Sequence, residues 1–153
     1  MEKLSKHVSY HEGVYSRTAQ RLGLKNDPSE DHLNNMKLIA EKVFEPLRSH
    51  VGGPIKINSF YRGPELNKAI GGSTKSQHCN GQAIDIDDTF KHATNAEMFN
   101  WIRENLNFDQ MIWEFGDDKN PAWVHISYVS EDKNRNRCLK AYKENGKTKY
   151  KVI

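Results

Sequence analysis

Hydrophobic positions recur at helical spacing over residues 33–47, after the polar segment KNDPSED. Ser29 suits the N-cap of this predicted helix, and the two acidic residues that follow it favour the first helical turn. Pro46 lacks the N–H that a helix interior uses, so the sequence predicts a kink or an end there. The segment from 9 to 22 is ambiguous, although its pattern allows a short helix.

Alternating hydrophobic and polar positions predict strands further along the chain. The first covers about residues 54–60, and Pro64 then opens a short helix that ends at a pair of glycines. The segments FDQMIWEF (108–115) and AWVHISYV (122–129) are rich in aromatic and β-branched residues, which favour strands.

Local turn and capping signals complete the predicted elements. Thr94 and Glu97 have capping-box spacing before an apolar helix face. The tail from 138 to 153 alternates on both sides of Asn145-Gly146, which suits a type I′ hairpin turn. The order of helices followed by mostly antiparallel strands, with one helix inserted, predicts an α+β fold in a single domain over residues 1–153.

Composition narrows the function classes. Hydrophobic residues make up 36% of the chain, charged residues 28%, and the net charge is +3. This is a globular composition, and its small, dispersed positive charge argues against nucleic acid as a partner. Cys79 and Cys138 form neither a CxxC pair nor a disulfide framework, so we expect two free thiols.

Strand alternation brings candidate chemistry to one face. Asp85 points away from its isoleucine neighbours, and His125 points away from Val124 and Ile126, so two adjacent strands would bring Asp85 and His125 to one cleft. His78 would reach the same cleft from the preceding loop. Two imidazoles and a carboxylate match the ligand set of catalytic zinc sites. The alternative is that these histidines are half-buried residues with ordinary hydrogen bonds.

Several motifs resemble one family. SQHCNGQAID (76–85) resembles the SxHxxGxAxD signature of zinc D-alanyl-D-alanine carboxypeptidases and phage peptidoglycan endopeptidases, and WVHIS (123–127) is similar to their later histidine motif. The segments at 52–72 and 108–116 are also similar, and the likeness runs from about residue 9 to 129. It implies one zinc ion and a small antiparallel sheet with helices on one face, as in the hedgehog signalling domain.

The resemblance also implies residue roles. His78, Asp85 and His125 match the zinc ligands of the family. Arg62 matches an arginine that meets the substrate carboxylate, a task for which its planar fork of donors is suited. Ser76 matches the motif serine, whose hydroxyl would bind substrate or hold a loop.

The general base is less clearly marked. Many relatives have an acidic residue three positions before the last histidine, where this chain has Ala122. Glu114 ends an apolar strand and is our candidate for the base. Asp117 and Asp118 are alternatives in the following loop, and Asp87 is a candidate to orient a ligand. Without a base, catalysis would be impaired.

The sequence therefore predicts a monomeric zinc metallopeptidase that acts on peptidoglycan stem peptides, either trimming a terminal D-alanine or cutting within the stem. The start of the sequence has no secretory signal pattern and the chain has no apolar run long enough to span a membrane. We therefore expect synthesis in the cytoplasm and, in a phage or prophage setting, release to the wall through a separate pore. The alternatives are a non-catalytic zinc-binding domain and a phage structural or adhesion domain of the same fold.

Overall fold

A computed structural model of the chain describes residues 2–153 and has an α+β fold, which confirms the predicted class. The strands are β1 (Lys3–Ser5), β2 (Val8–Ser9), β3 (Lys56–Ser59), β4 (Ala83–Asp87), β5 (Gln110–Glu114), β6 (Trp123–Ser127), β7 (Arg137–Glu144) and β8 (Lys147–Val152). The helices are α1 (Tyr10–Val14), α2 (Arg17–Leu22), α3 (Glu30–Ile39), the π-helix η1 (Ala40–Phe44), α4 (Glu45–Val51), α5 (Pro64–Ala69), the 3₁₀ helix η2 (Gln77–Asn80) and α6 (Asn95–Asn105).

The first long helix follows its sequence signals. Ser29 is the N-cap of α3, where its side chain accepts a hydrogen bond from the His32 N–H. At Pro46 the chain remains helical, but α3 passes through the π-helical turn η1 before α4 begins. Pro46 has no N–H to donate to the helix, and the wider π-helical turn before it accommodates this loss. The irregularity expected at Pro46 is therefore a short π-helical segment and not a kink or an end.

The N-terminal region contains more structure than its pattern marks. Residues 10–22 form the two short helices α1 and α2, each capped by a serine side chain. The strands β1 and β2 precede them as a small antiparallel pair. These strands are too short for two-residue periodicity to be recognised in the sequence.

The larger sheet of the described residues has the order β3-β4-β6-β5-β7-β8. Its pairs are antiparallel except for β5 and β7, so the predicted antiparallel sheet is mixed at this position. The reason lies in the connection over residues 128–136. β6 ends beside the start of β5, and the connection then crosses β5 to its other edge. β7 therefore begins at the same end as β5 and runs parallel to it.

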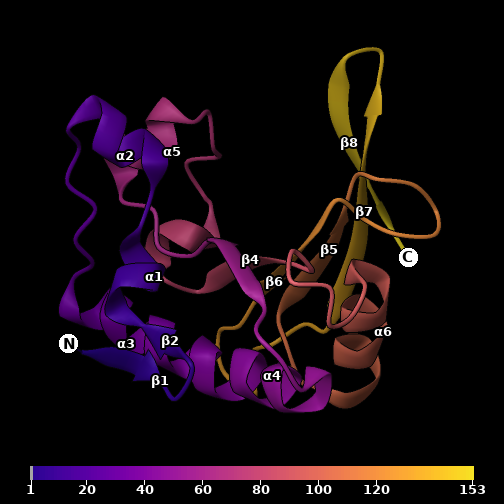
Figure 1. Cartoon of the computed structure of the whole chain (residues 1–153). Coiled ribbons are helices and arrows are strands. Elements are labelled where there is room, and N and C mark those ends of the chain that lie inside the picture. The colour runs from indigo at the N-terminus through magenta and orange to yellow at the C-terminus, as the bar shows by residue number, and fades with distance from the viewer. Residues whose placement is uncertain (1) are drawn as a thin grey trace.

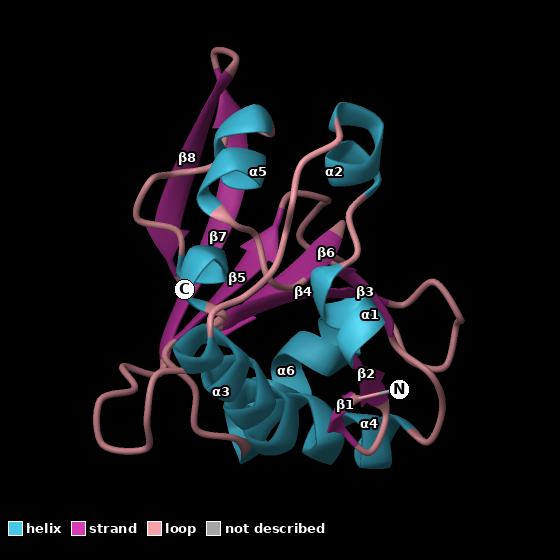
Figure 2. Cartoon of the chain, turned by 90° about the vertical axis from the view of Figure 1, so that its left-hand side faces the viewer, coloured by secondary structure: helices cyan, strands magenta, loops and turns pink. Residues whose placement is uncertain are grey.

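The core lies on one face of this sheet. The isoleucines of β4 and alternate residues of β5 and β6 pack there against α3, η1, α4 and α6; those of β5 and β6 are Met111, Trp113, Val124 and Ile126. Figures 1 and 2 show these helices gathered below the sheet, while α2, α5 and the β7–β8 hairpin rise on the other side. The helix layer thus leaves the opposite sheet face free to form a site.

Two local predictions are confirmed near the ends of elements. Thr94 caps α6 by accepting from the Glu97 N–H. Asn145 and Gly146, both with positive φ, join β7 to β8 as a type I′ turn requires. Both cysteines are free. Among the described residues, no helix combines the length and apolar character needed to cross a bilayer.

Candidate metal centre

The floor of the candidate site is formed by two neighbouring strands. β4 and β6 pair antiparallel, with Asp85 directly opposite His125. Because side chains alternate along a strand, this register places both on the face away from the core, as the sequence pattern predicts. The carboxylate Oδ1 of Asp85 lies 2.9 Å from Nδ1 of His125.

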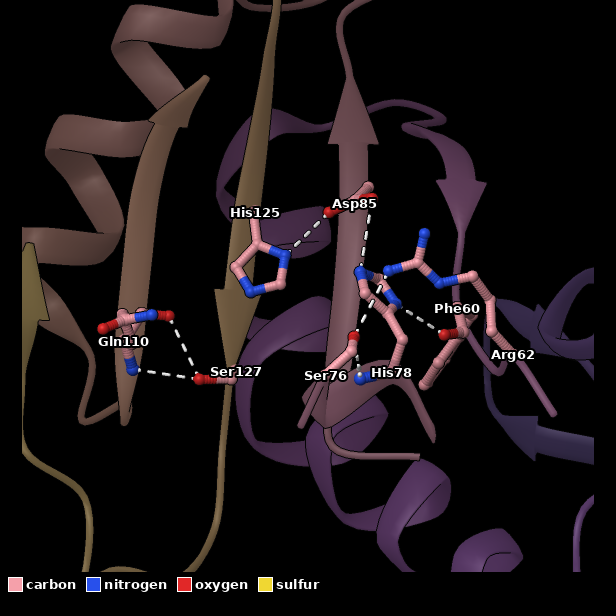
Figure 3. Close-up of polar contacts among 8 residues, drawn as sticks. All are labelled: Phe60, Arg62, Ser76, His78, Asp85, Gln110, His125 and Ser127. Atoms are coloured by element: carbon pink, nitrogen blue, oxygen red, sulfur yellow. Dashed lines mark hydrogen bonds and ion pairs between the residues drawn. The ribbon is translucent and has the colours of Figure 1, made fainter. Parts of the chain in front are cut away.

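His78 approaches this pair from η2. Its side chain is almost fully buried, and its Nδ1 lies 2.7 Å from the carbonyl oxygen of Phe60, to which it donates. The other ring nitrogen, Nε2, lies 3.3 Å from Oδ2 of Asp85 (Figure 3). The bond to Phe60 fixes the orientation and tautomer of the imidazole and leaves Nε2 free to bind a metal.

Gly81 makes this approach possible. It follows η2 with φ of 71°, in the left-handed region that glycine tolerates best. A Cβ atom at this position would lie 2.4 Å from the backbone oxygen of His32. The turn between His78 and the strand that holds Asp85 therefore needs glycine for both its conformation and its space.

The three side chains form one compact cluster. Each offers a ligand atom, and these atoms lie within 4.8 Å of one another. Burial alone raises the pKa of Asp85, but the imidazoles of His78 and His125 hold it far below its usual range. Burial lowers the pKa of His78, which favours the neutral imidazole. An ionised carboxylate and a neutral imidazole are the forms that ligate zinc, so the donor set fits such an ion.

Glu114 lines the same cleft from the end of β5. Its Cα is paired with that of Trp123, two residues before His125, so its side chain is on the site face of the sheet. Burial raises the pKa of Glu114 to about 7, where the charge of Asp85 also raises it and His125 opposes the change. A carboxyl group of this kind can both accept and donate a proton near neutral pH.

Arg62 and Ser76 form the side of the cleft next to His78. Arg62 Nη2 donates to Ser76 Oγ over 3.3 Å, and the same hydroxyl accepts from the His78 N–H over 3.2 Å. The Nε atom of Arg62 is buried and has no hydrogen-bond partner among the described residues. Ser76 thus holds both the guanidinium and the start of η2 in place.

The alternative acidic residues lie elsewhere. The Asp117 carboxylate accepts from two backbone N–H groups of its own turn, and Asp118 pairs with Lys140 at the surface. Asp87 accepts from Asn95 and Thr89, which ties β4 to the start of α6. These contacts give each of the three a structural role, and none of them belongs to the cluster of potential ligands. That Asp87 orients a ligand stays a prediction.

One part of the site has no signal in the sequence pattern. The buried Asp109 accepts from the side chain and backbone N–H of Arg135 and from Nε2 of Gln77, the residue before His78. The segment KNRNR around Arg135 has the composition of a solvated loop. Arg135 and its buried partner Asp109 are 26 positions apart, so no local sequence pattern relates them. The sequence therefore does not indicate that either residue belongs to the site.

The cluster opens into a cleft of about 690 Å³. Its lining includes Arg62 and the loop after α5 on one side and Leu139 and Tyr150 of the β7–β8 hairpin on the other. Figure 1 shows α5 and the hairpin on opposite sides of β4 and β6. A His-Asp-His cluster at the base of a wide polar cleft, with a protonatable carboxyl group beside it, is an arrangement that metal-dependent hydrolases use.

The comparison with known families agrees with this class. Residues 6–127 match the Peptidase M15 family, and the chain belongs to that family. The family is zinc-dependent, so the chain is a metallopeptidase by family, and the cluster of His78, Asp85 and His125 is able to hold the metal. No curated protein matches the chain.

Proposed function

We propose that this chain is a zinc metallopeptidase that hydrolyses the stem peptides of peptidoglycan. The observation that carries the proposal is the shared cleft, in which Glu114 and Arg62 flank a compact cluster of potential metal ligands. Membership of a zinc peptidase family of the peptidoglycan type supports the substrate class. The bond that is cut is either the terminal D-alanyl bond or one within the stem.

The metal would be held by His78 through Nε2, by His125 through Nδ1 and by the Asp85 carboxylate. The contact of His78 Nδ1 with Phe60 and the mutual approach of Asp85 and His125 support this assignment of atoms. When bound, zinc supplies Lewis acidity, which polarises a carbonyl group and makes water more acidic.

Glu114 is our proposed general base. Its carboxylate would take the proton that the attacking water loses and pass it to the nitrogen of the leaving amine. The raised pKa supports this assignment, because a group that titrates near neutrality can perform both transfers. Its low exposure also excludes bulk water from the transferred proton.

Arg62 is our proposed anchor for a substrate carboxylate. Its guanidinium lines the cleft close to the ligand cluster and has no carboxylate bound by a hydrogen bond among the described residues. Its planar donors suit a carboxylate in two-point contact. Ser76 would contribute by holding the guanidinium toward the cleft.

The decisive experiment is digestion of purified peptidoglycan by the zinc-loaded protein, the chelated protein and the chelated protein with zinc restored. We expect free D-alanine or new amino groups only in the two zinc-containing samples. His11→Ala, a change on the exposed surface of α1, should behave as wild type. If the zinc-loaded protein releases neither product, the proposed function is wrong.

Ala122 favours a second candidate, a zinc domain that binds without catalysis. The position three residues before His125, acidic in many relatives, has no carboxylate here. The same digestion separates the two functions, since a binding domain would retain zinc and bind peptidoglycan without releasing either product.

A further inference from the structure

The β7–β8 hairpin lies beyond the segment that matches the family, yet it forms part of the cleft. The match ends at residue 127, and the hairpin covers 137–152. Leu139 and Tyr150 nevertheless line the same cleft as Glu114 and His125. Because these two side chains line the cleft, the hairpin forms its second wall. In Figure 1 the hairpin rises opposite α5.

Strand pairing determines which hairpin side chains face the cleft. Ala141 is paired with Glu114 on one side and with Tyr150 on the other, so these three share a sheet face. Leu139 and Val152 are paired with each other on that same face. The lysines at 140, 149 and 151 point to the opposite face.

The cleft face of the hairpin is apolar but incompletely covered. Leu139 and Ala141 are buried against Ile112, whereas Tyr150 is 56% exposed and Val152 is 68% exposed. Single exposed apolar residues are common on protein surfaces and carry no meaning alone. Here the exposed aromatic ring continues a buried apolar patch that borders the candidate catalytic carboxylate.

The Tyr150 side chain lines the same cleft as Glu114, and the strand register places the two on the same face. Burial raises the pKa of Tyr150, and the carboxylate of Glu114 raises it further. Because the pKa of the phenol is raised, the side chain is uncharged at neutral pH. A neutral aromatic surface is suited to hold an apolar group close to the bond being cut.

The two walls differ in charge, which specifies the kind of ligand. The wall opposite Tyr150 and the adjoining rim carry the cationic side chains of Arg62 and Lys75. Arg135 also lines the cleft, but its guanidinium is paired with Asp109. A peptide with carboxylate groups on one side and aliphatic side chains on the other is complementary to both walls. Stem peptides have this chemistry, since they combine free carboxylates with alanine methyl groups.

We propose that Tyr150, supported by Leu139 and Val152, forms a subsite for an aliphatic side chain of the peptide beside the scissile bond. This inference rests on the proposed function and adds a specificity-determining wall from outside the matched segment. The ring makes the contact and the phenol hydroxyl is dispensable. The cationic rim and Tyr150 wall together select an acidic peptide with small apolar side chains.

The test measures the affinity of a soluble stem pentapeptide by titration calorimetry, with each variant in a zinc-loaded Glu114→Gln background that slows cleavage. We expect Tyr150→Ala to weaken binding about tenfold, because a lost apolar contact is worth roughly one to two powers of ten. Tyr150→Phe should bind within about twofold of the parent, since it keeps the ring. Tyr142→Ala is the matched control, because it removes a tyrosine from the other face of the same hairpin.

A second peptide sharpens the result. In a peptide with glycine in place of the alanine next to the scissile bond, the loss caused by Tyr150→Ala should shrink to about twofold. The inference is overturned if Tyr150→Ala binds like its parent, if Tyr142→Ala is equally impaired, or if Tyr150→Phe loses as much as Tyr150→Ala. Circular dichroism confirms that each variant is folded.

The outcomes also separate this inference from the proposed function. A wild-type protein that digests peptidoglycan in a zinc-dependent manner, with affinity that Tyr150→Ala leaves unchanged, contradicts the hairpin subsite alone. A wild-type protein that neither binds the pentapeptide nor digests peptidoglycan contradicts the proposed function and the subsite together.

Discussion

The floor and the hairpin wall of the cleft are built in opposite ways. His78, Asp85 and His125 on the floor come from η2, β4 and β6, with His78 almost fully buried and the other two half-buried. On the wall, β8 is an edge strand whose residues are all exposed. The floor lies inside the segment that matches the family, and the wall lies outside it.

This difference suggests that the floor serves metal binding and catalysis, whereas the wall serves substrate specificity. On the floor, paired strands and the Phe60 contact constrain each side chain, so a change there disturbs neighbours that cannot relax. On the wall, Tyr150 projects from an edge strand and can be replaced at little cost to the core. We therefore expect floor variants to lose metal or catalysis and wall variants to change peptide affinity.

The largest effect should follow from removing a floor ligand. We expect His78→Ala to weaken zinc binding by on the order of 10³-fold, because each ligand shares in a binding free energy of about 10–16 kcal/mol. Competition with a coloured chelator measures this affinity, and His11→Ala serves as the control. Zinc affinity that is equal in His78→Ala and wild type would remove His78 from the ligand set.

Glu114→Gln should separate catalysis from metal binding. We expect hydrolysis of peptidoglycan to fall about 10²–10⁴-fold, the usual range for loss of a positioned general base. Zinc affinity should stay within about threefold of wild type, because the cluster of potential ligands does not include Glu114. Retention of full activity would move the proton transfer to another group.

The same substitution should reveal the stability cost of a buried carboxylate. The pKa of Glu114 rises from its ordinary value of 4.5 to about 7 on folding, so between these values the folded state holds the proton more tightly. The contribution of Glu114 to the free energy of unfolding is therefore fully present below pH 4.5 and is lost as the pH rises from 4.5 to about 7. Above pH 7 the free energy of unfolding stays at the lower value.

In the metal-free protein at pH 8, we expect Glu114→Gln to be more stable than wild type by about 3 kcal/mol, since one pKa unit corresponds to about 1.4 kcal/mol. The difference should largely disappear at pH 4. Urea denaturation of both proteins in chelator at pH 4, 6 and 8 measures it. A constant difference across the three pH values would contradict a raised pKa at Glu114.

The sequence predicts the floor better than the wall for a physical reason. Alternation along two short strands is a local property, and it correctly places Asp85 and His125 on one face opposite the core isoleucines. Their function as ligands remains a prediction. The identity of neighbouring strands is a long-range property, and here the proximity of Asp85 to His125 required the pairing of β4 with β6.

The wall depends on such long-range pairing alone. Asn145-Gly146 predicts the hairpin correctly, but no local pattern indicates that β7 pairs parallel with β5. That pairing brings Tyr150 into line with Glu114. The contact of Arg135 with the buried Asp109 is hidden for the same reason, because its donor lies in a loop with a polar, solvated pattern.

Asp109 connects the floor to the chain beyond the matched segment, so its replacement tests whether the two regions are independent. It accepts from Gln77 beside His78 and from Arg135 after β6. We expect Asp109→Asn to lower the free energy of unfolding by about 2 kcal/mol, because buried hydrogen bonds to a charged group are weakened. Thermal or urea unfolding measures this change.

The matched control for that prediction is Asp132→Asn. Asp132 lies in the same loop as Arg135, the partner of Asp109, but is exposed, and its side chain accepts from Ser130. We expect its replacement to change stability by less than about 0.5 kcal/mol. Equal effects of the two substitutions would show that the buried contact of Asp109 does not stabilise the floor.

The smallest expected effect tests the independence of the wall most directly. Gly146 has φ of 76° and no atom near its absent Cβ, so Gly146→Ala strains the turn without a clash. The cost should be about 1 kcal/mol, that of placing alanine in the left-handed region. Because β8 is the edge strand and, within residues 2–153, pairs only with β7, we expect this cost to appear as faster hydrogen exchange in the hairpin amides.

The amides of β4 and β6 and the zinc affinity should be unchanged by Gly146→Ala. The pentapeptide affinity should fall slightly, because Tyr150 is held less rigidly. If the amides of β4 and β6 lose protection equally, floor and wall unfold as one unit, and variation in the hairpin would necessarily disturb the metal centre.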